Sequence, residues 1–182
     1  MNKKEKSFIP VFVVLIISLL IASFWDKIDI IKNTAHKILN PSAGVLLEYN
    51  LILGMILLTF IIAIFMTIIQ KYTTDQEELK KLKKDQKAMQ EEMKKYKQDP
   101  QKIMELQKKQ MQELPETFMK TFKLGMRPII YTGIPLILFI RWFYDYFASI
   151  GTSKIFGIHW IIVYIILTMI FTGVLRKILK VH

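Results

Sequence analysis

Residues 72–123 form a block rich in lysine and glutamate, and the chain on both sides of it is apolar enough to cross a membrane. Soluble domains interleave charged and apolar residues, whereas here the two classes, 23% and 52% of the chain, are separated into long runs. Uncharged runs of about 18 residues or more are typical of membrane-spanning helices. The sequence therefore predicts a multispanning membrane protein with one large polar element.

The polar element, residues 72–123, has the periodicity of two helices. In its first half, residues at alternating spacings of three and four form a seam with one polar interruption: Leu79, Leu82, Gln86, Met89, Met93 and Tyr96. The pattern stops at Asp99-Pro100, because proline lacks an amide proton and restricts the residue before it. Helical spacing resumes with Ile103, Met104, Leu106, Met111, Leu114 and Phe118. This predicts an antiparallel coiled-coil hairpin, and a purely solvated spacer is the alternative interpretation.

The apolar runs divide the remainder of the chain. Residues 1–25 contain a basic tail and an uncharged run that is longer than the apolar region of a typical secretory signal and ends in Ser23-Phe24-Trp25. We therefore expect a retained first span here rather than a cleaved signal. Residues 26–44 should form an extracytoplasmic amphipathic helix over 26–40 that is ended by Asn40-Pro41-Ser42.

Three core spans are expected after the amphipathic helix. The first core span is predicted within residues 45–71, beginning near Val45. Residues 124–182 should contain the second and third core spans and a basic C-terminal tail. At the far end of the second core span, Arg141 and Asp145 are placed to pair at i,i+4. The predicted fold class is thus an all-α integral membrane protein with three core spans, an N-terminal span and a cytoplasmic coiled-coil hairpin.

Lysine and arginine near the ends of the spans predict the orientation, because cytoplasmic loops carry an excess of both. The hairpin side holds Lys71, Lys120, Lys123, Arg127, Arg176, Lys177 and Lys180. The loop between the last two spans contributes only Arg141 and Lys154. The hairpin and the C-terminus are therefore expected in the cytoplasm, in a multi-pass protein of the cell's plasma membrane.

No constellation of catalytic or metal-binding residues stands out in the sequence. The histidines His36, His159 and His182 are scattered, and there is no cysteine, glycine-rich phosphate loop or nucleophile motif. The basic residues that give the net charge of +11 flank the apolar runs, and the sequence contains no nucleic-acid motif. Attraction to an anionic lipid surface therefore explains the positive charge more simply than nucleic-acid binding. We expect no enzymatic activity, metal, cofactor or sequence-specific nucleic-acid binding.

Polar residues of the last three spans gather toward their cytoplasmic halves at helical spacing. The candidate groove residues are Thr67, Gln70, Arg127, Tyr131, Thr168, Thr172 and Arg176. Isolated threonines in membrane helices usually bond to their own backbone or to a neighbouring helix, which is the alternative interpretation. Polar side chains are costly when they face lipid, so three converging stripes predict a cavity open to the cytoplasm and closed toward the outside.

The order of these parts resembles the YidC/Oxa/Alb insertase superfamily, and in particular its archaeal YidC-like branch, kin to the third subunit of the endoplasmic reticulum membrane protein complex. The resemblance rests on the hairpin between two core spans, the amphipathic residues 26–40, and a tryptophan-led last span from Gly157-Ile158-His159-Trp160 to Arg176-Lys177. Family members commonly carry an arginine on the first core span facing the groove, and this chain has none there.

The resemblance implies a membrane protein insertase or chaperone that accepts nascent polypeptides from the cytoplasm and releases them into the bilayer. The implied partners are nascent membrane polypeptides and lipid, with a ribosome or targeting factor as a candidate donor through the hairpin. Four methionines, Met89, Met93, Met104 and Met111, are candidate contacts of the hairpin with a nascent chain, and packing between the hairpin helices is the alternative. A membrane-anchored scaffold or tether is the second function considered. A small cation channel is disfavoured because no span carries a ring of acidic residues.

Overall fold

The computed structural model describes residues 9–96 and 100–181, and nearly all of these are helical. The N-terminal half contains α1 (Ile9–Ser23), α2 (Asp29–Leu39), the π-helical turn η2 (Asn40–Gly44), α3 (Val45–Tyr49) and α4 (Leu51–Thr73). The C-terminal half contains α5 (Gln76–Lys95), α6 (Pro100–Met126), α7 (Ile129–Ser149), β1 (Lys154–Ile155), β2 (Ile158–His159) and α8 (Trp160–Ile178). The predominantly helical fold agrees with the predicted class, and the described residues add one short antiparallel pair, β1–β2, which turns at Phe156 and Gly157 with positive φ.

Two helices, α4 and α8, are each long and apolar enough to span a membrane. A third candidate span is the pair formed by α6 and α7, which meet at a bend of 57°. The apolar helix α1 has 15 residues, fewer than the roughly 20 that a straight helical span needs. The protein is therefore a helical multi-pass membrane protein. Within residues 9–96 and 100–181, two helices qualify as spans by length and composition, or three spans if the bent pair counts as one.

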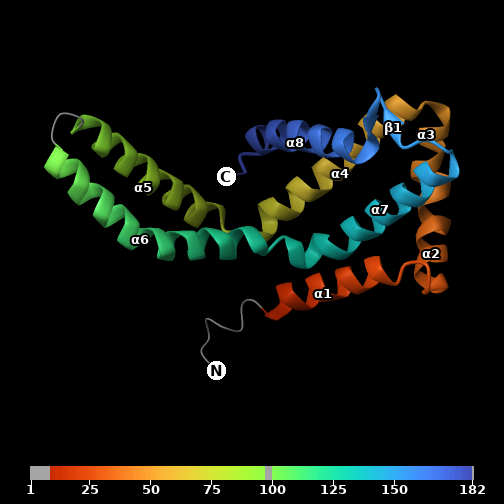
Figure 1. The fold of residues 1–182 in the computed structure, drawn as a ribbon, viewed down its shortest axis with the longest axis horizontal. Helices are drawn as coiled ribbons and strands as arrows, with labels where there is room; N and C mark the ends of the chain where they lie inside the picture. The colour runs from red at the N-terminus through yellow and green to blue at the C-terminus, as the bar shows by residue number, and fades with distance from the viewer. Residues whose placement is uncertain (1–8, 97–99, 182) are drawn as a thin grey trace.

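The helices pack as two pairs (Figure 1). Helix α4 packs along α8, and α1 packs along α7, while α4 and α7 contact each other much less. The helices α5 and α6 project from one end of this bundle as an antiparallel hairpin, and the last residues of α8 lie at the same end. The opposite end carries α2, α3 and the β1–β2 pair.

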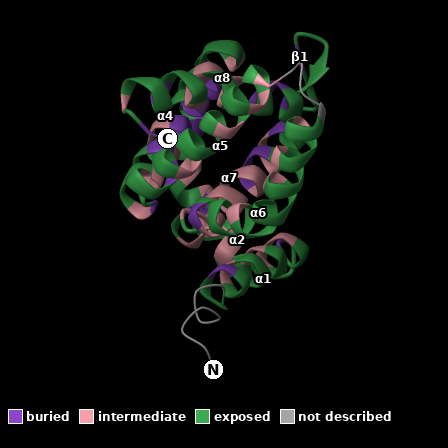
Figure 2. Cartoon of the chain, turned by 90° about the vertical axis from the view of Figure 1, so that its left-hand side faces the viewer, coloured by how far each residue is buried: buried purple, intermediate pink, exposed green. Residues whose placement is uncertain are grey.

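The hydrophobic core lies at the end away from the hairpin. It combines the first half of α4, the second half of α7 and the first turns of α8, with Met55, Trp142, Phe143 and Trp160 among its most buried residues. Figure 2 shows buried residues where the helices face one another and exposed residues over their outer faces. The packing thus seals one end of the bundle and leaves its hairpin end looser.

The amphipathic α-helix α2 ends at Leu39 with Asn40 as its C-cap, close to the predicted end at Asn40-Pro41-Ser42, but the chain stays helical beyond it. The helix continues through Pro41 as the π turn η2, in which the amide of Val45 donates to the carbonyl of Asn40. Proline lacks an amide proton and its ring crowds the carbonyl four residues earlier. A wider π turn accommodates both constraints, so α2 runs on through η2 into α3.

The first core span begins at Leu51 rather than near Val45, because Asn50 breaks the helix. Its backbone is extended, and its side chain accepts hydrogen bonds from the amides of Ile52 and Leu53 at 3.1 and 3.0 Å. Residues 45–49 form α3, which folds back on the start of α4. A Cβ atom at Gly54 would lie 2.4 Å from the carbonyl oxygen of Leu46, so this close approach requires glycine.

In the hairpin, the predicted seam of α5 lies toward α6. Leu79 is buried, while Leu82, Met89, Met93 and Tyr96 are half-buried, and the polar member Gln86 is exposed. Asp75 caps α5 by accepting a hydrogen bond from the amide of Glu78 at 3.0 Å. The predicted break at Asp99-Pro100 falls partly outside the described residues, since Asp99 is not among them, and α6 begins at Pro100.

Candidate functional site

A cavity of about 270 Å³ lies between α4 and α7, toward the middle of the bundle. Each helix contributes one face, with α7 residues at the i, i+3, i+4, i+7 spacing of a single helical side. The lining residues are Ile61, Ile62, Phe65, Met66, Thr132, Pro135, Leu136 and Phe139. The cavity is therefore apolar, apart from one threonine.

A space is left between α4 and α7 because the most closely packed face of each helix contacts a different helix. On α4, residues four apart (Met55, Thr59, Ala63 and Thr67) are almost fully buried, and the small residues among them let α8 approach closely. On α7, a Cβ atom at Gly133 would lie 2.8 Å from Val14 of α1, so α1 occupies that side. The faces left over on α4 and α7 line the cavity, which is partly open to the outside.

Stacked aromatic rings close the bundle at the end away from the hairpin. The rings of Phe147 and Trp160 are 5.2 Å apart and nearly parallel, and Phe143 stacks on Trp160 at 5.9 Å. Trp142, fully buried, packs against Phe143 and donates its indole proton to the side chain of Asn40 at 2.8 Å. This end of the bundle is well packed, in contrast to the region of the cavity.

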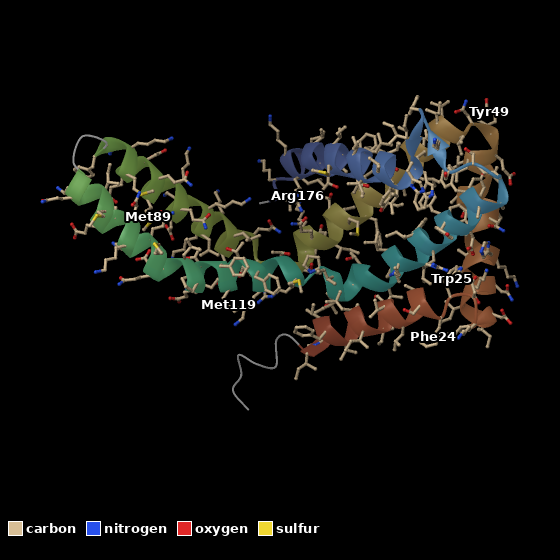
Figure 3. The ribbon with its side chains drawn as sticks, in the orientation of Figure 1. Phe24, Trp25, Tyr49, Met89, Met119 and Arg176 are labelled. Carbon is tan, nitrogen blue, oxygen red and sulfur yellow. The ribbon has the colours of Figure 1, made fainter. Side chains whose placement is uncertain are left out.

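At the hairpin end, one polar contact bridges α4 and α8. The Arg176 guanidinium donates to the side-chain oxygen of Gln70 at 2.8 and 3.1 Å (Figure 3 shows Arg176 at the end of α8). Both residues were predicted site residues, and the structure brings them together at the mouth of the bundle. Arg127, just before α7, and Tyr131, in its first turn, are exposed at the same end.

The threonines among the predicted groove residues do not form a polar lining. The hydroxyl groups of Thr67 and Thr168 donate to the carbonyls of Ala63 and Tyr164, four residues earlier, at 2.6 and 2.7 Å. These bonds match the alternative interpretation in which membrane threonines satisfy themselves on their own helix. Thr67 is completely buried, and Thr168 and Thr172 are half-buried on α8.

The seven predicted groove residues are thus not the lining of the cavity. Of the described residues that line it, none belongs to the seven, and the polar residue present, Thr132, donates its hydroxyl to the carbonyl of Pro128 at 3.0 Å. The lining residues were missed because aliphatic and aromatic side chains facing a cavity look the same in a sequence as those facing lipid. The sequence feature that pointed to this region was the presence of Gly133 and Pro135 inside the second core span.

A polar network at the far end of α7 was also missed. Asp145 accepts a hydrogen bond from the Trp25 indole at 2.8 Å, and it lies 2.9 Å from His36 and 3.6 Å from Lys32. Figure 3 shows Trp25 where α1, α2 and α7 meet. The pKa of Lys32 is raised, chiefly because its ammonium group donates a hydrogen bond to Asp26 at 2.6 Å.

The predicted Arg141–Asp145 pair at i,i+4 is wrong. Arg141 instead pairs with Asp26 at 3.4 Å, and its guanidinium lies over the rings of Trp25 and Tyr144. Tertiary partners from the turn between α1 and α2 therefore replace the local pair. The result is a polar anchor that fixes the N-terminal helices to α7.

The four candidate methionines of the hairpin divide into two pairs. Met89 and Met93 are half-buried on the seam side of α5, and Met89 points toward α6 (Figure 3). Met104 and Met111, on α6, are each 73% exposed. Packing between the helices accounts for the first pair, and the second pair remains accessible to a partner.

A family model described as "Integral membrane protein EMC3/TMCO1-like" matches residues 36–156 of the chain. The match includes the amphipathic helix from His36 onward, α4, the hairpin, α7 and β1, and therefore both walls of the cavity. Neither a curated protein nor a solved structure matches the chain.

Proposed function

The chain belongs to the EMC3/TMCO1-like family of integral membrane proteins, and from this premise we propose that it is a non-enzymatic insertase or membrane chaperone for nascent membrane polypeptides. The observation that carries the proposal is the apolar cavity between α4 and α7. It lies between a sealed end, closed by stacked aromatic rings, and a hairpin end with exposed polar residues. An apolar substrate segment entering from the hairpin end would meet the cavity partway into the membrane.

The size and chemistry of the cavity indicate how much of a substrate it would hold. Small-molecule pockets measure about 300–1,000 Å³, so a volume of about 270 Å³ accommodates a few side chains rather than a whole helix. The remaining surface of the substrate would stay in contact with lipid, which allows its release sideways. Polar flanks would be held near Arg127, Tyr131 and the Gln70–Arg176 pair, whose long side chains reach water.

The proposed activity has no catalytic step and uses no cofactor, since transfer of an apolar segment into lipid is itself favourable. The proposed partners are nascent membrane polypeptides and the bilayer, with a ribosome or targeting factor as donor through the hairpin. Exposed Met104 and Met111 offer the adaptable apolar surface that such contacts use.

We propose that the hairpin and the C-terminus face the cytoplasm, with α4, α7, α8 and the uncharged run of residues 8–25, which contains α1, all crossing the plasma membrane. Lysine and arginine flank the hairpin-side ends of these helices, and the amphipathic α2 would then lie at the outer surface. Single cysteines at Ser153 and at Gln107 should react with impermeant reagents from opposite sides of the membrane. The chain has no native cysteine to give background, and labelling of both positions from one side would reject the four-span orientation.

The insertase proposal predicts contact between the cavity and a nascent chain. A photoreactive amino acid at Phe65 or Leu136 should crosslink a ribosome-stalled single-spanning polypeptide. The same probe at Ile170, exposed on α8, should not. Filling the cavity with Leu136→Trp should lower insertion into proteoliposomes several-fold, and Ile166→Trp on the exposed face of α8 should leave it unchanged.

A tether would give a different pattern in the same experiment. It would capture one fixed partner through the hairpin, without nascent-chain crosslinks at Phe65 or Leu136. Equal insertion by the Leu136→Trp and Ile166→Trp variants, each shown to be folded, would also contradict the assignment of the cavity.

A further inference from the structure

The hairpin helices α5 and α6 do not close on each other along their whole length. At the base, Leu79 and Leu124 are buried, and the Thr74 hydroxyl donates to the carbonyl of Leu124 at 3.4 Å. Near the tip, Met93 and Ile103 are half-buried. Between these closed ends lies a groove of about 600 Å³.

The sequence explains why the seam opens there. In the middle of the hairpin both helices present polar residues among the apolar ones, such as Asp85 and Gln86 on α5 and Gln110 and Thr117 on α6. Polar side chains of this kind do not interdigitate with an apolar seam as leucine would. Pro115 additionally removes one hydrogen bond from the middle of α6, which weakens the helix beside the groove.

The groove combines apolar and acidic character. Leu114 and Phe118 line it and are 52% and 61% exposed, so apolar surface is left uncovered on the hairpin. Its carboxylates are Asp85, Glu113 and Glu116, and its one lysine is Lys120. Lys120 pairs with Glu116 at 2.9 Å, while Asp85 and Glu113 form no ion pair with any described residue.

Against a net charge of +11 for the whole chain, this acidic groove is a local exception. Lysine outnumbers aspartate and glutamate in α5 and α6 together, yet the carboxylates gather where the apolar side chains are uncovered. A ligand that matches both features has apolar residues on one face and lysine or arginine beside them. The groove's apolar wall suits a helix, since a helix places residues three and four apart on one side.

We propose that the groove between α5 and α6 binds a basic amphipathic helix, namely an apolar segment of a substrate polypeptide with lysine or arginine on its flank. This inference rests on the proposed function, because it names the substrate feature that the hairpin would recognise before entry into the membrane. Asp85 and Glu113 bind the basic flank, and Leu82, Met89, Leu114 and Phe118 cover the apolar face. Met89 adapts to different apolar side chains because its unbranched chain is flexible.

The test uses the full chain in nanodiscs of zwitterionic lipid and a fluorescent helical peptide of leucine and lysine. Anisotropy should show saturable binding above that of empty nanodiscs, and binding should weaken as salt screens the charges. The double variant Asp85→Lys/Glu113→Lys should weaken binding at least tenfold. The matched control Glu92→Lys/Glu105→Lys alters two exposed carboxylates outside the groove by the same total charge and should change binding less than threefold.

Three results would overturn the proposal: no binding above empty nanodiscs, equal weakening by both double variants, or equal affinity for a leucine–glutamine peptide. The cavity variant Leu136→Trp distinguishes this proposal from the insertase proposal. It should lower insertion without changing peptide binding. If the peptide does not bind but Leu136→Trp still lowers insertion, only the groove proposal is rejected. If the peptide binds but Leu136→Trp leaves insertion unchanged, only the cavity proposal is rejected.

Discussion

The Asp145→Leu variant should release α1 and α2 from α7 and lower the free energy of unfolding by about 3 kcal/mol, because buried polar groups that lose a partner cost roughly 1–3 kcal/mol each. Asp145 accepts the indole proton of Trp25, which is only 1% exposed, and it lies 2.9 Å from His36. Leucine offers no acceptor to either group. The indole would be left buried and unpaired, so the end of α1 should leave its site.

Two measurements check this expectation. The melting temperature in detergent should fall, and a cysteine at Ala22 should become more reactive in the Asp145→Leu background. The matched control is Asp145→Asn, which keeps an oxygen that accepts from Trp25 and removes only the charge. It should show a clearly smaller loss, and equal stability of Asp145→Leu and the unaltered chain would contradict the proposed anchor.

The Gly54→Leu variant should be the most damaging change in the core, at about 3 kcal/mol or more, since overpacking a dense site typically costs 1–3 kcal/mol even where side chains can move. A Cβ atom at Gly54 would lie 2.4 Å from the Leu46 carbonyl oxygen and 2.8 Å from the Leu47 Cα. Both are backbone atoms, so no side-chain rotation relieves the contact. Helix α3 would have to leave α4, and the Asn50 cap would be strained with it.

Gly173 provides the control for Gly54, because it also lies in an apolar helix, α8, and a Cβ atom there would meet nothing within 4 Å. Gly173→Ala should be neutral or stabilise the protein by about 0.5–1 kcal/mol, the usual cost of glycine within a helix. Thermal unfolding of both variants in the same detergent gives the comparison. A Gly54→Leu protein as stable as Gly173→Ala would show that α3 does not pack as described.

The length and charge of each run in the sequence determined most of the helices. Uncharged runs predicted α4 and α8, because a helix that buries no charge over about 20 residues suits a bilayer. The three- and four-residue spacing from Leu79 to Tyr96 predicted the face of α5 that lies toward α6. These features depend on local periodicity and composition, which a sequence displays directly. The membership in the EMC3/TMCO1-like family was likewise indicated by the order of these parts.

Only the tertiary structure determined which face of each helix contacts another helix, the cavity or lipid. Periodicity identifies which residues share a side of a helix, but lipid and a neighbouring helix are equally apolar, so it does not identify what covers that side. The α4–α7 cavity, lined by residues such as Phe65 and Leu136, therefore had no polar signature. Thr67 and Thr168 could satisfy their hydroxyl groups on their own helices, so their spacing carried no information about a groove.

The polar contacts that fix the bundle were also decided by tertiary structure. Asp145 could pair locally with Arg141, but the turn after α1 and helix α2 bring Trp25 and His36 to it from more than 100 positions away in the sequence. At Pro41, a π turn carried the helix through a residue that normally ends one. At Asp145 packing supplied other partners for the carboxylate, and at Pro41 the backbone bond of the π turn, from Val45 to Asn40, let the helix continue.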